Sequence, residues 1–160
     1  MPREDYAVDQ DIVFRSDVEF DPVRIHGAAI YCSDGRFGEA CDDFIMNGLG
    51  LPRYDRIALP GGPGALAGHP EARLEHDSVA DELRFLVEAH KLDRVVLISH
   101  HQCAFYSHVL KTPVEEIEAR QRADISRAAE YVREITKVDR VETYFARPVD
   151  GRIRFERFGA

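Results

Sequence analysis

The first residues able to do chemistry follow an apolar stretch early in the chain. The segment CSDGR at 32–36 places a thiol, a carboxylate and a guanidinium at every second position. If the chain stays extended here, Cys32, Asp34 and Arg36 lie on one side, because successive strand side chains point to opposite faces. The three groups would then line one wall of a site.

A second reactive cluster, HHQC at 100–103, follows another apolar run. A tight or helical turn after Ser99 would place His100 and Cys103 on a common face, because residues three apart are neighbours on a turn. A strand continued to the end of the cluster would instead pair His101 with Cys103. We favour His100 and keep His101 as the alternative.

Both clusters come directly after runs that are typical of buried strands. Residues 24–32 and 94–99 are short and largely apolar, and residues 56–60 form a weaker third run. Residues 141–155 predict two strands joined around an Asp-Gly pair, which tolerates positive φ.

Two helices are predicted between and after these runs. Ser78 and Asp81 resemble a capping box, and the face of the helix that follows collects Val79, Leu83, Leu86, Val87 and His90. A second helix opens at Thr112 with Pro113 at its first position. Its buried side is expected to consist of Val114, Ile117, Ile125, Ala128, Ala129, Val132 and Ile135.

These elements predict an α/β fold: a mostly parallel central β-sheet flanked by helices, with an antiparallel C-terminal edge strand. We expect one domain over residues 1–160, with residues 1–22 as an extended or loosely packed arm. In open α/β sheets, sites form at the carboxyl ends of strands. The two reactive clusters are therefore expected to meet.

Composition excludes several kinds of partner. The chain has 29 acidic and 21 basic residues and a net charge of −8, so it would repel nucleic acids and anionic membranes. No apolar run is long enough to span a bilayer, and the first residues lack the apolar region of a signal peptide. Three cysteines are too few for a secreted disulfide framework. We expect a cytoplasmic protein without membrane or nucleic-acid partners.

The two clusters together contain a recognised zinc-binding set. Two thiolates and one imidazole can hold Zn²⁺, and three protein ligands leave the fourth tetrahedral position to water or substrate. A chain of 160 residues needs no metal merely to fold, so the zinc would serve catalysis. Asp34 could accept a hydrogen bond from zinc-bound hydroxide, and Arg36 would keep that carboxylate ionised.

Other reactive side chains have simpler interpretations. Cys41 shares a helical face with Phe37, Phe44 and Ile45, so we interpret it as core. The remaining histidines are expected at the surface or in satisfied core positions: His26, His69, His76, His90 and His108.

A glycine-rich segment, residues 59–68, follows the third apolar run. It matches neither the dinucleotide-binding fingerprint nor a P-loop, so we do not expect nucleotide binding. We interpret Gly61, Gly62 and Gly64 as a tight turn where side chains would clash.

The paired motifs resemble those of the β-class carbonic anhydrases, whose signature is C-x-D-x-R followed by H-x-x-C. The similarity extends over roughly residues 24–155. It implies a zinc enzyme that hydrates carbon dioxide reversibly to bicarbonate, with Cys32, His100 and Cys103 as ligands.

The same resemblance implies roles for the acid and its arginine. Asp34 would either accept a hydrogen bond from zinc-bound water or become the fourth ligand in a closed form, and Arg36 would hold it. The resemblance also implies a homodimer or a higher homo-oligomer.

Three departures from that family keep other functions open. Residues 59–68 lack the polar side chains typical of the family there, and Ser99 and Ala104 replace glycines that commonly flank the second motif. One alternative is a hydrolase of carbonyl sulfide or carbon disulfide, for which a less polar wall is no handicap. The other is a non-catalytic zinc-binding module.

Overall fold

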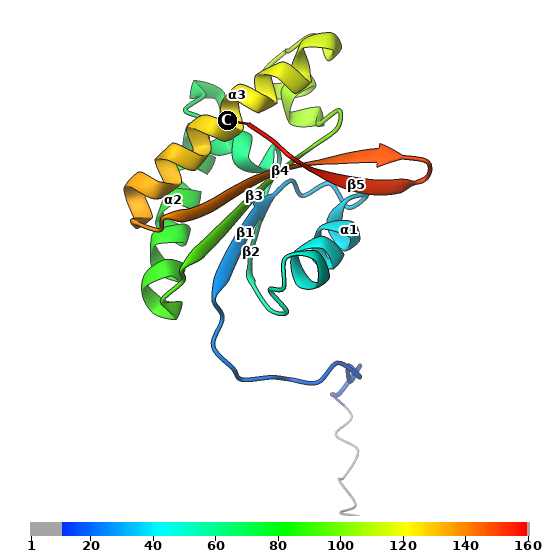
Figure 1. Ribbon diagram of the computed structural model, residues 1–160, viewed down its shortest axis with the longest axis vertical. Coiled ribbons are helices and arrows are strands. Elements are labelled where there is room, and N and C mark those ends of the chain that lie inside the picture. Colours follow the sequence, from blue (N-terminus) through cyan, green and yellow to red (C-terminus); the bar gives the residue numbers. More distant parts are fainter. Residues whose placement is uncertain (1–10, 160) are drawn as a thin grey trace, which may run out of the picture.

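The computed structural model describes residues 11–159 and contains a five-stranded sheet (Figure 1). Its strands are β1 (Gly27–Tyr31), β2 (Asp55–Ala58), β3 (Arg94–His100), β4 (Arg140–Val149) and β5 (Arg152–Arg157). Their order is β2-β1-β3-β4-β5, with parallel pairing throughout except between β4 and β5. This arrangement confirms the predicted fold class.

Helices and helical turns connect the strands. They are α1 (Gly38–Asp43), η1 (Phe44–Gly48), η2 (Gly62–Leu66), η3 (Pro70–Ala72), α2 (Arg73–His90), η4 (Phe105–Val109) and α3 (Val114–Thr136). In Figure 1, α2 and α3 lie together on one side of the sheet, and α1 lies on the other. None of the helices in residues 11–159 combines the length and the apolar character that crossing a bilayer requires.

The central strands are buried on both faces, which explains their continuous apolar sequence. In β1, Ala28 and Ile30 pack with α2 and α3, whereas Ala29 and Tyr31 pack with α1 and η1. The alternation follows from the two-residue period of a strand. The sheet is therefore held rigidly between two helical layers, and its carboxyl edge is a firm base for loops.

The expected helix starts differ from the structure. Ser78 lies inside α2, which begins at Arg73, so the capping-box assignment was wrong. The residue that marks the start of this helical region is Pro70, which is the first residue of η3, and α2 follows η3 directly. Asp81 pairs with Arg84 at 3.1 Å instead.

One predicted buried position and one predicted helix start are also corrected. Val114 is 62% exposed, because the buried face of α3 begins one turn later, at Ile117. Pro113 stands just before the helix rather than at its first position. His90 is exposed at the end of α2, where it bonds Asp55 at 2.6 Å.

The ends of the chain agree with the sequence pattern where they are described. Asp150 and Gly151 both have positive φ, 50° and 76°, and join β4 to β5 as predicted. Residues 11–22 are exposed and contain neither helix nor strand, and residues 1–10 lie outside the described residues. The single-domain assignment over 1–160 stays a prediction.

The glycine-rich segment 59–68, called here the glycine loop, is pressed against the chain that leaves β1. A Cβ on Gly62 would lie 2.8 Å from the backbone nitrogen of Cys32, and one on Gly61 would lie 2.5 Å from the ring of Phe105. Both glycines have positive φ. Only glycine permits this close backbone approach, as the sequence indicated.

We expect Gly62→Ala to destabilise the fold by about 2 kcal/mol more than Gly50→Ala. Both positions have positive φ, which costs a side chain about 1–2 kcal/mol, but only Gly62 adds a clash with backbone. Urea unfolding of the two variants measures the difference. Equal losses of stability in the two variants would show that the glycine loop can move away from the added Cβ at no cost.

Candidate metal centre

Three side chains from the two reactive clusters meet at the carboxyl edge of the sheet. Ligand atoms of Cys32, His100 and Cys103 all lie within 4.8 Å of one another, and the two sulfur atoms are 3.8 Å apart. The parallel register pairs Tyr31, the last residue of β1, with Ile98, two residues before the end of β3, so both strands end at the same edge of the sheet. Strand pairing therefore brings together residues about 70 positions apart.

The imidazole of His100 is fixed with one nitrogen free. Its Nδ1 lies 2.9 Å from the carbonyl oxygen of His101 and donates to it, which leaves the lone pair on Nε2. His100 is 3% exposed, and its Nε2 has no hydrogen-bond partner among the described residues. A buried acceptor without a donor is costly. An imidazole with an unpartnered nitrogen and a ligand atom within 4.8 Å of two sulfur atoms fits a metal ion.

His101 belongs to different surroundings. Its backbone N–H donates to the carbonyl of Ala146 on β4 at 3.0 Å, and its side chain lines a cavity of about 220 Å³ with Glu118 and Gln121. The geometry therefore joins His100, and not the alternative His101, to the two thiols.

The two thiols are electrostatically unequal. The hydrogen bond from Cys103 lowers the pKa of Cys32 and outweighs the opposite effect of burial, and the N–H groups of Asp34 and Gly61 lower it further. The same contact with Cys32, together with burial, raises the pKa of Cys103. Of the two thiols, Cys32 therefore loses its proton more readily, and a bound cation would favour loss of the proton from Cys103 as well.

Asp34 is held by Arg36 rather than by the ligand group. The guanidinium donates to both carboxylate oxygens, from Nε to Oδ1 at 3.0 Å and from Nη2 to Oδ2 at 2.6 Å. These bonds lower the pKa of Asp34 to about 2. The chain does not stay extended through 32–36: it turns after Asp34, where the N–H of Phe37 bonds the Asp34 carbonyl at 3.1 Å. The Asp34–Arg36 ion pair therefore results from this turn, and not from the alternation of side chains along an extended strand.

Comparison with known proteins identifies the family. A family model described as "Putative carbonic anhydrase" matches residues 24–154. The chain belongs to this family. A search of curated protein sequences found no significant match.

The chain is similar to solved carbonic anhydrase structures at low identity. The β-carbonic anhydrase isoform I of Trichomonas vaginalis has a TM-score of 0.50 and 16% identity, with 89% of this chain and 88% of that one covered. For CafD of Aspergillus fumigatus the values are 0.48 and 14%, with 89% and 94% covered. For the Streptococcus mutans carbonic anhydrase they are 0.45 and 16%, with 86% and 87% covered.

Side chains outside the ligand group mostly follow expectation in this carbonic anhydrase family member. Cys41 is 2% exposed in the core, and burial raises its pKa to about 12. His108 bonds its neighbour Ser107. His69 is satisfied by a buried partner, because its Nε2 lies 2.7 Å from a carboxylate oxygen of Asp124, a residue that is 1% exposed.

The sequence reasoning missed two polar residues on the buried face of α3. Gln121 and Asp124 are both 1% exposed, and Gln121 donates from Nε2 to the carbonyl of His100 at 2.9 Å. The available signal was their position, because both fall on the helical face that carries Ile117 and Ile125. Polar residues on such a face need partners.

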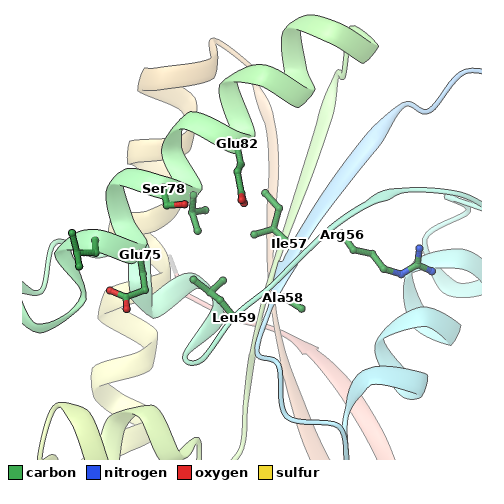
Figure 2. A pocket seen from close by; sticks show the side chains of 9 residues that line it. Arg56, Ile57, Ala58, Leu59, Glu75, Ser78 and Glu82 are labelled. Atoms are coloured by element: carbon green, nitrogen blue, oxygen red, sulfur yellow. The ribbon is translucent and has the colours of Figure 1, made fainter.

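A larger cleft lies away from the thiols. Figure 2 shows it between β2 and α2, where Glu75, Ser78 and Glu82 of the helix face Ile57 and Leu59. It measures about 540 Å³, and its lining contains neither cysteine nor histidine. Its chemistry gives no reason to place the site of the carbonic anhydrase family there.

We expect Arg36→Ala to raise the pKa of Asp34 from about 2 toward its ordinary value of 3.8. In the wild type the pair stabilises the fold above about pH 4, and this contribution is lost as the pH falls toward 2. Carboxyl ¹³C NMR titration measures the shift. Arg84→Ala, which breaks the Asp81 pair on α2, is the control and should leave Asp34 unchanged. An Asp34 titration unaltered in the Arg36 variant would contradict the assignment.

Proposed function

We propose that the chain binds Zn²⁺ through Cys32, His100 and Cys103 and catalyses the reversible hydration of carbon dioxide to bicarbonate. The observation that carries the proposal is the buried imidazole of His100: its Nε2 has no hydrogen-bond partner among the described residues, and a ligand atom of the ring lies within 4.8 Å of both sulfur atoms. Membership of the carbonic anhydrase family supports it. Zinc in such a set lowers the pKa of a bound water, so that a nucleophile exists at neutral pH.

The chain's own residues would orient that nucleophile. Asp34 follows Cys32 by two residues, and its pKa of about 2 keeps it ionised, and so a hydrogen-bond acceptor, at every pH of interest. The guanidinium of Arg36 donates a hydrogen bond to each carboxylate oxygen of Asp34. This bidentate contact restricts the direction from which a further donor can approach the carboxylate. The carboxylate would hold the nucleophile with a lone pair toward the linear substrate.

A catalytic site is favoured over a structural one by the ligand count. Structural zinc sites are usually closed by four protein ligands, whereas three leave a position for water. Asp34, two residues after Cys32, is an acidic residue that could close the set, but Arg36 holds it. The non-catalytic module is therefore the weaker alternative.

The glycine loop favours one alternative substrate class. Residues 61–66 are buried. The three of them that are not glycine are apolar: Pro63, Ala65 and Leu66. An apolar wall suits carbonyl sulfide or carbon disulfide as well as carbon dioxide. Hydrolysis of these sulfur analogues is the second candidate function.

Stopped-flow carbon dioxide hydration between about pH 7 and 9 tests the function. We expect turnover well above the buffer rate with one zinc per chain, and at least about a tenfold loss in Asp34→Ala and Arg36→Ala with zinc retained. Asp81→Ala serves as the matched acidic control. Cys103→Ser should lose the metal, and full zinc content there would overturn the ligand set. Inactivity of zinc-loaded wild type would shift the assignment to carbonyl sulfide or carbon disulfide hydrolysis, assayed next.

We also propose that the chain acts as a homodimer in the cytoplasm, where its thiols stay reduced. Residues 11–23 carry large apolar side chains that are mostly exposed, among them Val13 at 97%, Phe14 at 82% and Phe20 at 90%. In Figure 1 this segment runs away from the sheet. Such a concentration of exposed apolar surface is typical of an interaction site.

Light scattering measures the assembly. We expect a dimer for the wild-type chain and a monomer when Val13, Phe14 and Phe20 are all replaced by serine. Each substitution removes apolar surface that the dimer would bury, and burial of that surface favours association. A wild-type monomer, or a dimer indifferent to the triple substitution, would contradict this role of the segment.

A further inference from the structure

A buried carboxylate on α3 ties together the segments that carry the candidate ligands. Asp124 is 1% exposed, and its Oδ2 accepts from the hydroxyl of Tyr106 at 2.8 Å and lies 2.7 Å from Nε2 of His69. Its other oxygen, Oδ1, faces Arg127 at 3.4 Å. We call Asp124, Tyr106 and His69 the Asp124 clasp.

Both donors of the clasp come from segments of the metal centre. Tyr106 lies three residues after Cys103, and its N–H bonds the Cys103 carbonyl at 3.1 Å. His69 directly follows the glycine loop, and the Tyr106 hydroxyl packs where a Cβ on Gly64 would lie 2.5 Å away. One carboxylate oxygen therefore holds the turn after Cys103 against the glycine loop.

The protonation of Tyr106 suits this arrangement. Burial, and then the charge of Asp124, raise the pKa of its phenol, so the hydroxyl keeps its proton and donates. The bond is buried and therefore directional and little screened.

Gln121 extends the same support to the third ligand. It lies one turn before Asp124 on α3 and donates to the carbonyl of His100. Helix α3 thus reaches the His100 segment through an amide and the Cys103 segment through a carboxylate. Metal ligands that are oriented by such outer contacts bind their ion more tightly, by about 10–100-fold.

We propose that Asp124 is a positioning residue of the metal centre, which fixes Cys103 and the glycine loop through Tyr106 and His69. The inference rests on the proposed metal-binding function. The other buried residues of this helix face are mainly aliphatic, and replacing a buried ionic group by apolar packing is often neutral or stabilising. The stability of the fold therefore gives no reason for a carboxylate at this position. Fixing the orientation of two loops does give one.

Tyr106→Phe is the central variant, because it removes one hydrogen bond without opening a cavity and avoids the folding risk of altering Asp124. The control is Arg127→Ala, which removes the contact on Oδ1 but leaves both donors on Oδ2. Cobalt(II) is the probe metal. We expect Tyr106→Phe to release Co²⁺ to a chelator about tenfold faster than wild type, with shifted visible absorption bands. Arg127→Ala should match wild type in both.

Hydrogen exchange of the metal-free proteins, followed by mass spectrometry, gives a second readout that needs no metal. We expect faster exchange in Tyr106→Phe within residues 61–69 and 101–110 and no change in β3 or α2. Unchanged exchange, or a uniform increase that reports only lower stability, would overturn the proposal. Wild-type release rate and spectrum in Tyr106→Phe would overturn it too. Failure of the wild-type protein to bind Co²⁺ would instead overturn the metal-binding function, and the exchange data would still decide the clasp.

Discussion

The parallel pairing of β1 with β3 is the constraint on which the site depends. Because the two strands run in the same direction and in register, the chain leaves both at one edge of the sheet, with Cys32 and His100 beside each other. Helices cover both faces of these strands, so the edge cannot shift without disturbing two packed layers. The loops can therefore vary in sequence while the positions from which they start stay fixed.

A second constraint is the glycine loop, which packs against the segments of the two thiols at that edge of the sheet. The N–H of Gly61 is directed at both Cys32 and Cys103, which favours negative charge on sulfur before any cation arrives. Backbone donors cost no side-chain entropy and can approach closely only where Cβ atoms are missing. This accounts for the glycines of the loop, whose other buried members are apolar.

Much of the fold and part of the site could be predicted from sequence, for reasons that particular residues make clear. Buried strands are visible as apolar runs, so the ends at Tyr31 and His100, and hence the meeting of the two clusters, follow from topology. The turn after Asp34 was missed, because an Asp side chain bonding two residues ahead leaves no periodic signal. The contact of His69 with Asp124 joins positions 55 residues apart, and no local pattern reports it.

The clasp links the stability of the fold to the occupancy of the metal centre. A metal that binds only the folded chain stabilises it by about 2.7 kcal/mol at one hundred times its dissociation constant. Residues that pre-orient the ligands raise the affinity and therefore the stability under the same conditions, although a buried carboxylate by itself is a poor stabiliser. The polar positions of α3 are thus best understood through the loops that they hold. Their cost in the metal-free chain would be offset when an ion joins the thiols and the imidazole.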